Sequence, residues 1–372
     1  MDAKQQFRHA AIRQDESGQP KIVTKAIPPQ LLPDTVIIKT IAVALNPSDY
    51  KILKNYPLPG AQVGSDFAGT VVDGQEVEGV PGCESPSREP ALPPGTMVCG
   101  AVPGFSKSAR LSNGAFADYV RAPRSLLLRV PTTMPAAGAA TLGTALMTCA
   151  LALWADDALQ LSGTPEQPIP PHNRPVPVLV YGGSTATGTV AIQLLRMAGY
   201  SPLTTCSQRN AELVRQRGAD VVFDRAAPDV AEQIKRYTNG RLEFVLDCIA
   251  DVDSVTCCYA AIQRPGGRYA ALERVPEKLL LKRRAVEAFL VLAPEAIGEG
   301  VSLGEKYQRS ASQEKRALAV RCMAMFQRLL DDGKLIPHPV QLLDGWLEAI
   351  PQGLELLETG SVSGRKLVAL RT

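Results

Sequence analysis

A turn rich in glycine and hydroxyl groups is the clearest chemical signal in the sequence. It lies in VLVYGGSTATGTVAIQLL (178–195), between an apolar run and a helical pattern. Its glycines are Gly182, Gly183 and Gly188. Glycines at a strand-to-helix turn let the backbone approach a pyrophosphate, and the helix N-terminus supplies free N–H groups and a partial positive charge. The hydroxyl groups of Ser184, Thr185 and Thr187 can bond phosphate oxygens. The turn predicts a dinucleotide site, and a purely structural turn is the alternative.

The residues after the next strand distinguish NAD from NADP. An NAD site expects Asp or Glu about 20 residues beyond the turn, where the carboxylate binds the ribose 2′-hydroxyl. The sequence at 204–210 is TTCSQRN, which contains no carboxylate. Ser207 and Arg209 instead offer a hydroxyl and a cation to a 2′-phosphate. We therefore predict NADPH as the cofactor; the alternative is that Arg209 is a solvated charge at the start of a helix.

The surrounding elements place this turn in an alternating α/β block. Strand-like runs alternate with helical patterns at 177–182, 189–199, 202–206, 210–219, 220–224, 229–238, 242–249, 254–262 and 267–272. This order predicts a parallel, doubly wound sheet. Residues 1–130 are instead β-rich, with a predicted surface loop at 79–94. A later helix is predicted at 312–332, and the tail has the pattern of a helix, a turn and a final strand.

Composition narrows the class of protein. The 372 residues suggest about two domains, and a net charge of +3 does not favour nucleic acid as a partner. The eight cysteines form no C-x-x-C pair and the N-terminus is polar, so we expect a reducing, cytoplasmic location. Residues 132–155 carry no charge. Because they are rich in Ala, Gly and Thr, we predict a buried helix between domains, extending to about Leu161, rather than a membrane span.

The order of the elements resembles that of the medium-chain dehydrogenase/reductase superfamily. A β-rich N-terminal part is followed by a dinucleotide-binding domain, and the C-terminal tail rejoins the N-terminal part. The likeness is carried by LNPSDYK (45–51), VGSDFAGTVV (63–72), GAFADYV (114–120), the glycine turn and GSVSGRKLV (360–368). The resemblance implies an α/β fold with two domains. One is a chaperonin-10-like β-barrel catalytic domain, residues 1–135 and 311–372. The other is a doubly wound Rossmann domain, residues 136–310, with the active cleft between the two.

Zinc alcohol dehydrogenases of this superfamily carry a cysteine after the strand that ends here at Leu45, and a G-H-E motif. This chain has Asn46 and Gly64-Ser65-Asp66 at those places. We therefore expect no metal.

Within the zinc-free branch the sequence resembles fungal trans-acting enoyl reductases, which serve highly reducing polyketide synthases or synthase–peptide-synthetase hybrids. The cues are NPSDYK, YGGSTATGT, LGTALMT (142–148), SPLTTCSQRN (201–210), VVFD (221–224) and Leu272-Glu273. Arg225 stands where that family usually has Tyr.

The resemblance implies NADPH-dependent reduction of an α,β-unsaturated acyl thioester carried by an acyl carrier domain, by a monomeric enzyme. Two alternatives stay open: a free-standing quinone or enone reductase, and a non-catalytic NADPH-binding scaffold. Lys51 is the first catalytic candidate, because Asn46-Pro47 suits a helix start that puts 48–51 on the first turn. Its ammonium could stabilise an enolate, donate a proton or hold the cofactor. A surface lysine on a short helix is the alternative.

The resemblance also implies a set of contacts. Cofactor contacts are expected at Ser48, Asp49, Tyr50, Lys51, Ser184, Thr185, Ala186, Thr187, Ser207, Gln208, Arg209, Asn210, Arg225, Leu272, Glu273, Val362 and Ser363. Substrate contacts are expected at Thr141, Leu142, Gly143, Thr144, Ala145, Leu146, Met147, Thr148, Ala293, Pro294, Glu295, Ala296 and Ile297. The small residues of 141–148 equally suit tight helix packing. A basic patch for the acidic carrier domain is expected at the mouth of the cleft, with Arg264, Lys282, Arg283 and Arg284 as candidates.

Overall fold

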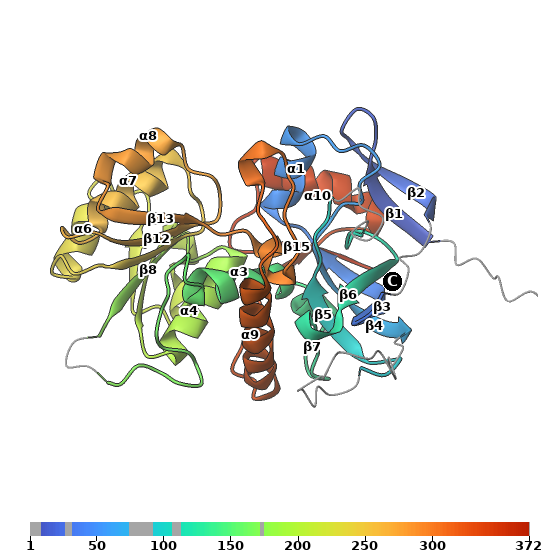
Figure 1. Ribbon diagram of the computed structural model, residues 1–372, viewed down its shortest axis with the longest axis horizontal. Helices are drawn as coiled ribbons and strands as arrows, with labels where there is room; N and C mark the ends of the chain where they lie inside the picture. Colours follow the sequence, from blue (N-terminus) through green and yellow to red (C-terminus); the bar gives the residue numbers. More distant parts are fainter. Residues whose placement is uncertain (1–8, 27–31, 74–91, 106–112, 172–174, 372) are drawn as a thin grey trace, which may run out of the picture.

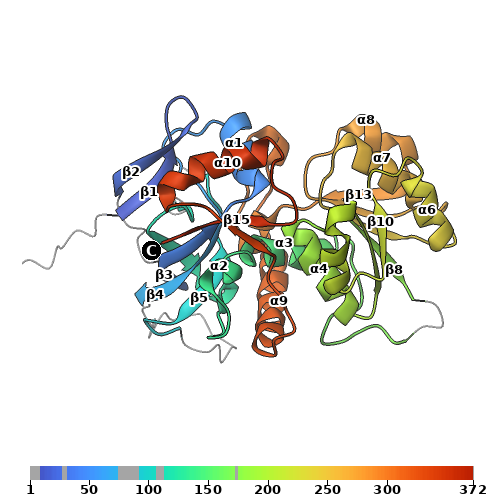
Figure 2. The ribbon, with the colours of Figure 1, turned by 180° about the vertical axis from the view of Figure 1, so that it is seen from behind.

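The computed structural model describes residues 9–26, 32–73, 92–105, 113–171 and 175–371. It has two lobes, each built on a β-sheet, with helices α3 (Gly143–Trp154) and α9 (Gln313–Asp331) between them (Figures 1 and 2). Most of the predicted loop at 79–94, namely residues 79–91, lies outside the described residues.

The middle of the chain forms a parallel sheet of six strands. In chain order they are β8 (Pro177–Tyr181), β9 (Ser201–Cys206), β10 (Val221–Asp224), β11 (Phe244–Asp247), β12 (Gly267–Ala271) and β13 (Val286–Leu290). Their spatial order is β10-β9-β8-β11-β12-β13. This is the doubly wound order 3-2-1-4-5-6. The first three strands are added toward one edge of the sheet and the last three toward the other, so the order reverses between β8 and β11. The prediction of a doubly wound sheet is confirmed, although β13 was not predicted.

Helices connect these strands, four of them where the sequence predicts a helix and one where none was predicted. The four are α4 (Ala186–Met197), α5 (Ala211–Gln216), α6 (Val230–Tyr237) and α7 (Val252–Ala261), and the one that was not predicted is the short α8 (Glu277–Leu280). Side-chain caps fix two of their starts. Thr185 accepts a hydrogen bond from the Gly188 amide before α4, and Asp251 accepts one from the Ser254 amide before α7. Such caps satisfy N–H groups that have no partner inside the helix.

The other lobe combines N-terminal and C-terminal strands. The N-terminal strands are β1 (His9–Gln14), β2 (Pro20–Ala26), β3 (Thr35–Ala44), β4 (Asp66–Asp73), β5 (Met97–Ala101), β6 (Tyr119–Pro123) and β7 (Leu128–Arg129). The tail adds β14 (Val340–Leu342) and β15 (Lys366–Leu370). The sheet order is β14-β15-β3-β4-β5-β7, β6 also pairs with β3, and β1 and β2 form a separate two-stranded sheet. Because β15 lies antiparallel to β3, with Val368 opposite Ala44, the tail completes this sheet.

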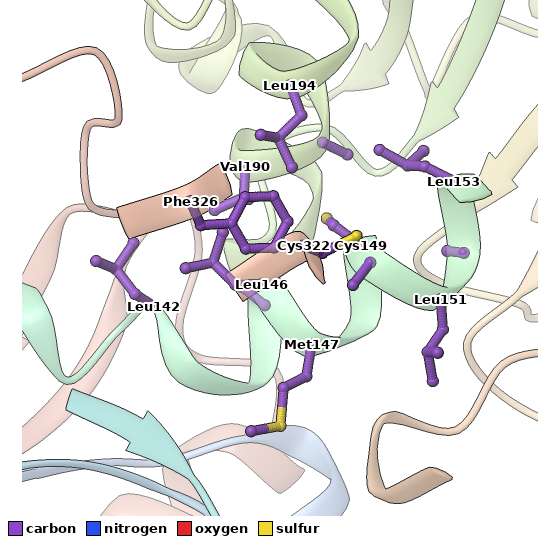
Figure 3. Close-up of a cluster of buried hydrophobic side chains, with 14 of the residues drawn as sticks. Leu142, Leu146, Met147, Cys149, Leu151, Leu153, Val190, Leu194, Cys322 and Phe326 are labelled. Carbon is purple, nitrogen blue, oxygen red and sulfur yellow. The ribbon is translucent and has the colours of Figure 1, made fainter. Parts of the chain in front are cut away.

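Helix α3 forms the centre of the largest core cluster. Figure 3 shows Leu142 and Leu146 gathered with Val190 of α4 and Phe326 of α9. Its start is set by a close approach, because a Cβ at Gly143 would lie 2.2 Å from the Gly100 carbonyl oxygen of β5. The prediction of a buried helix is therefore confirmed.

The predicted end of this helix at Leu161 is wrong. The helix stops at Trp154, since Ala155 is extended with ψ 147°. Its beginning is also interrupted, because α2 (Ala136–Ala139) is separated from α3 by a turn at 140–142. Among the described residues one stretch, Ala136–Trp154, has the length and apolar character to cross a membrane, and it is mostly buried inside the protein, as core helices are.

Two further helices complete the second lobe. Helix α1 (Pro47–Asn55) begins with Asn46 at the N-cap and Pro47 as its first residue, as the sequence predicts. Helix α10 (Ile350–Glu358) packs beside α1 (Figure 1). The division of the chain into domains at 135 and 310 stays a prediction.

Candidate active site

The glycine turn lies at the carboxyl end of β8, where the sheet order reverses. Gly182 has φ +81°, a left-handed conformation that favours glycine. A Cβ at Gly183 would lie 1.9 Å from the Thr204 hydroxyl oxygen, and one at Gly188 would lie 2.5 Å from the Gly182 carbonyl oxygen. Only glycine fits these last two places without rearrangement. The three glycines are buried, so the turn is packed tightly at the switch point, where dinucleotides bind in this fold.

Helix α4 begins directly after this turn, with Thr185 as its N-cap. The Thr185 hydroxyl caps the Gly188 amide at 3.0 Å. The backbone N–H groups of Ala186 and Thr187 have no acceptor among the described residues. Ser184, Thr185, Ala186 and Thr187 are all half-buried rather than enclosed. These donors, together with the helix dipole, fit the pyrophosphate of a dinucleotide.

The end of β9 supplies polar and cationic groups. Arg225 donates from Nε to the Ser207 hydroxyl at 3.2 Å, so these two predicted residues lie together. Gln208 and Arg209 are exposed. No carboxylate occupies 204–210, so these residues offer hydroxyl groups and a cation but no acidic group.

Asn210 joins the glycine turn to the tail of the chain. Its side-chain amide donates to the Ser363 hydroxyl at 2.9 Å and lies 3.3 Å from the Ser184 hydroxyl. Three residues predicted as cofactor contacts are thus brought together from distant parts of the sequence. The neighbouring Val362 packs partly against the core of the second lobe.

Lys51 and Glu273 meet where the two lobes face each other. Lys51 lies on α1, and Glu273 follows β12 at the carboxyl edge of the parallel sheet, next to the half-buried Leu272. The Lys51 ammonium nitrogen is 3.1 Å from Glu273 Oε2, across 222 residues of sequence. Their side chains are 37% and 31% exposed, so the pair remains accessible to a small molecule.

Glu273 is held as a carboxylate by its neighbours. Partial burial alone would raise its pKa. Hydrogen bonds from the Tyr307 hydroxyl and the Arg274 amide, and the charge of Lys51, outweigh burial and lower the pKa below the usual value. Ionised Glu273 thus gives the Lys51 ammonium a stable partner.

Beneath α1 lies a buried polar cluster. Lys366 of β15 donates to Asp66 Oδ2 at 2.5 Å and to Asn46 Oδ1 at 2.8 Å. Asp66 also accepts the Asn46 side-chain amide at 2.9 Å and the Thr144 backbone N–H at 2.5 Å. Asp66 is fully buried and Lys366 is 4% exposed. The cluster ties the start of α1, the start of α3, β4 and β15 to one another.

Asp49 belongs with this cluster rather than with the accessible surface. It is fully buried, and its Oδ2 accepts the Asn46 backbone N–H at 2.8 Å. Burial raises its pKa to about 7. The predicted cofactor contact through this side chain is therefore corrected to a helix-capping role. Of its predicted neighbours, Ser48 is exposed, and Tyr50 packs partly against the core.

The residues predicted to bind substrate on 141–148 are mostly committed to packing. Leu142, Ala145, Leu146 and Met147 are at most 2% exposed, and Thr141 is fully buried. Thr148 bonds the Thr144 carbonyl at 2.7 Å. These side chains pack inside the protein, which is the alternative to substrate binding. The predicted direct contacts with substrate are therefore corrected to packing contacts. Only Thr144 is half-buried, and its hydroxyl has no partner among the described residues.

The second predicted substrate segment forms a short 3-10 helix, Ala293–Ile297. Ala296 is fully buried, and Glu295 is 4% exposed and pairs with Lys315 at 2.7 Å. These two side chains are therefore corrected to core and ion-pair roles. The other three residues of the segment are half-buried: Ala293, Pro294 and Ile297. Their contact with substrate stays a prediction.

The expected basic patch is in the wrong place. Arg264 precedes β12, and Lys282, Arg283 and Arg284 precede β13, so all four lie at the amino end of the parallel sheet. The glycine turn and Glu273 lie at the opposite, carboxyl end. Arg283 also uses its guanidinium to bond the Ile262 and Gln263 carbonyls near the end of α7.

Sequence patterns missed several groups at this site. Tyr307 and Lys366 gave no local signal, since their partners are 34 and 300 residues away. His338 was also missed. It is 3% exposed and bonds the Thr189 hydroxyl of α4 through Nδ1 at 2.9 Å. Within the described ranges, no group of three or more His, Cys, Asp or Glu side chains could hold a metal ion.

Comparison with known proteins agrees with this geometry. Residues 32–132 match the family described as alcohol dehydrogenase GroES-like domain, and residues 186–298 match the family described as zinc-binding dehydrogenase. The trans-enoyl reductase TwmE of Talaromyces wortmannii is 51% identical over 97% of both chains. The trans-enoyl reductase poxP of Penicillium oxalicum is 41% identical over 97% of this chain and 92% of its own.

A solved mycobacterial structure in complex with NADPH shares the fold. Its TM-score is 0.67 at 22% identity, covering 98% of this chain and 100% of that one.

Proposed function

We propose that this chain, which belongs to the trans-enoyl reductase family, uses NADPH to reduce the α,β-unsaturated acyl thioester of a growing polyketide. The thioester is carried by an acyl carrier domain of a partner synthase, in the cytoplasm, and the reductase acts as a monomer without a bound metal. The observation that carries the proposal is the Lys51–Glu273 pair. It sets an accessible cation at the carboxyl edge of a dinucleotide-binding sheet.

The residues present fit a nicotinamide dinucleotide. The free N–H groups at the start of α4 would hold the pyrophosphate, and Ser207, Arg209 and Arg225 would hold the 2′-phosphate. When bound, the cofactor supplies a hydride to the β-carbon of the substrate. All other steps fall to groups of this chain.

The chain must stabilise the enolate and deliver a proton. Electron density moves onto the thioester oxygen as the C–H bond forms at the β-carbon, and the α-carbon then takes up a proton that originates from solvent water. An ammonium has three N–H donors, and Lys51 uses one toward Glu273. The other two remain for the substrate oxygen. We propose that Lys51 stabilises the enolate by charge and hydrogen bonding, in the manner of an oxyanion hole.

A metal ion is not required in this scheme. Asn46 and Asp66 are occupied by the ammonium of Lys366, which is a cation supplied by the chain itself. Metal analysis of the purified protein is the direct check, and stoichiometric zinc would contradict this part of the proposal.

The decisive experiment compares two acceptors. NADPH oxidation is followed with a pantetheine-linked α,β-unsaturated thioester and, in parallel, with a simple quinone. Turnover of the thioester alone supports the proposal. Turnover of the quinone alone would favour a free-standing reductase, and tight NADPH binding without turnover of either acceptor would favour a non-catalytic scaffold.

A further inference from the structure

We propose that Tyr307 is a positioning residue that fixes the Lys51 ammonium by holding Glu273. The inference rests on the proposed function of Lys51. Tyr307 ends a short 3-10 helix, Glu305–Tyr307, in the connection between β13 and α9. Tyr307 itself lies outside the residues that either family model matches.

The two oxygens of Glu273 have different partners. Oε1 accepts the Tyr307 hydroxyl and, at 2.9 Å, the Arg274 backbone N–H. Oε2 faces the Lys51 ammonium at 3.1 Å. With two donors on one oxygen, the carboxylate cannot rotate freely, so the other oxygen points in one direction. That direction is toward Lys51.

Tyr307 also contacts the helix that carries Lys51. Its ring meets the ring of Tyr56 edge-on, with centroids 5.5 Å apart and an interplanar angle of 83°. Tyr56 is the C-cap of α1, and Lys51 lies on the same helix. The tyrosine therefore connects α1 to the end of β12 by a second route, independent of the ion pair.

The ion pair needs such support because it is partly exposed. Ion pairs between exposed long side chains contribute little, since solvent screens the charges and both side chains retain other rotamers. At about one-third exposure, Lys51 and Glu273 resemble that case. The Tyr307 hydroxyl removes rotamers of Glu273 without adding charge, and it keeps the carboxylate ionised.

Tyr307→Phe isolates this hydroxyl group, and Tyr237→Phe is the matched control. Tyr237 is 51% exposed on α6, in the other lobe. We expect Tyr307→Phe to lower kcat for the thioester about tenfold with the KM values nearly unchanged, because positioning of a catalytic group affects the transition state. Tyr237→Phe is expected to retain wild-type kcat. Thermal unfolding followed by circular dichroism verifies that both variants fold.

A spectroscopic measurement separates this inference from the proposed function. Lysines are labelled by reductive methylation with ¹³C, and the Lys51 signal is assigned with Lys51→Arg. We expect this signal to move toward the free-lysine position in Tyr307→Phe and to stay in place in Tyr237→Phe. If wild-type protein reduces no thioester, the proposed function fails, while the signal still tests the contact. An unmoved Lys51 signal in Tyr307→Phe would overturn the inference.

A double variant tests whether Tyr307 acts through Glu273. Tyr307→Phe/Glu273→Gln is expected to be no slower than Glu273→Gln alone, since the two residues form one unit. Independent, multiplicative losses in kcat would show that Tyr307 acts by another route and would contradict the inference.

Discussion

Lys366→Met is predicted to destabilise the protein strongly, because it removes the cation from a buried ion pair. The Lys366 side chain is 4% exposed and the Asp66 side chain is fully buried. The distance from Lys366 Nζ to Asp66 Oδ2 is 2.5 Å. Removing Lys366 leaves the buried Asp66 carboxylate with two hydrogen-bond donors but no cationic partner, and breaking a buried ion pair in this way costs about 3–5 kcal/mol. Asn46 Oδ1 also loses its 2.8 Å donor.

This loss in the free energy of unfolding predicts a measurable decrease in melting temperature. An unfolding entropy of about 2.1 cal/mol/K per residue gives about 780 cal/mol/K for the 372 residues. A loss of about 4 kcal/mol therefore lowers Tm by about 5 °C. Circular dichroism during heating, together with urea titration, measures both quantities.

An exposed lysine of the same lobe provides the control. Lys54 pairs with Glu358, and their side chains are 65% and 43% exposed. Lys54→Met should change stability by less than about 1 kcal/mol. Lys366→Met/Asp66→Leu should recover much of the loss, since apolar residues then replace both charges. The reasoning is refuted if Lys366→Met is no more destabilising than Lys54→Met.

Four further outcomes are predicted. Lys51→Ala should lower kcat for the thioester at least about tenfold with the fold intact, and unchanged turnover in the NADPH oxidation assay would make the lysine a bystander. Arg209→Ala should weaken binding of NADPH far more than binding of NADH in fluorescence titrations, whereas equal losses would exclude a 2′-phosphate contact. Gly183→Ala should abolish NADPH binding or folding, as seen by calorimetry and circular dichroism, because its Cβ would lie 1.9 Å from the Thr204 hydroxyl oxygen. Burial lowers the pKa of folded His338 to about 3, while the unfolded residue takes up a proton below about 6.5. Acid therefore favours the unfolded state, so lowering the pH from 7 to 5 should cost wild type about 2 kcal/mol more than it costs His338→Gln in urea titrations.

Comparison with His338→Gln is needed because a second buried group titrates in the opposite sense. The pKa of Asp49 is raised to about 7, so the folded state binds a proton between about pH 7 and the usual value near 3.8. Acid thus favours the folded state at Asp49 and the unfolded state at His338. The pH dependence of the wild type alone would mix the two contributions.

Local patterns predicted the elements of this protein well. The runs at 177–182, 202–206 and 220–224 became β8, β9 and β10, and the predicted helix at 312–332 became α9. Apolar periodicity and turn residues are properties of neighbouring positions, so the sequence displays them directly. Strand β13 was missed because two of its five residues, VEAFL, are exposed and one of these is a charged glutamate.

Long-range pairs could not be predicted in the same way. Nothing near Lys51 indicates Glu273, and nothing near Lys366 indicates Asp66, 300 residues earlier. The small residues of 141–148 were compatible with both substrate contact and helix packing. The choice depended on what faced them, and Gly100 of β5 and the side chains of α4 and α9 occupy that space (Figure 3).

The tail of the chain explains why these distant residues converge. Strand β15 pairs with β3, and this pairing carries Lys366 to Asp66 and Asn46. The turn just before β15 then brings Ser363 to Asn210 at the end of β9. A single C-terminal segment therefore stabilises the helix that bears Lys51 and also closes on the dinucleotide side. Stability of the second lobe and assembly of the site are consequently coupled, because both depend on the same few residues of the tail.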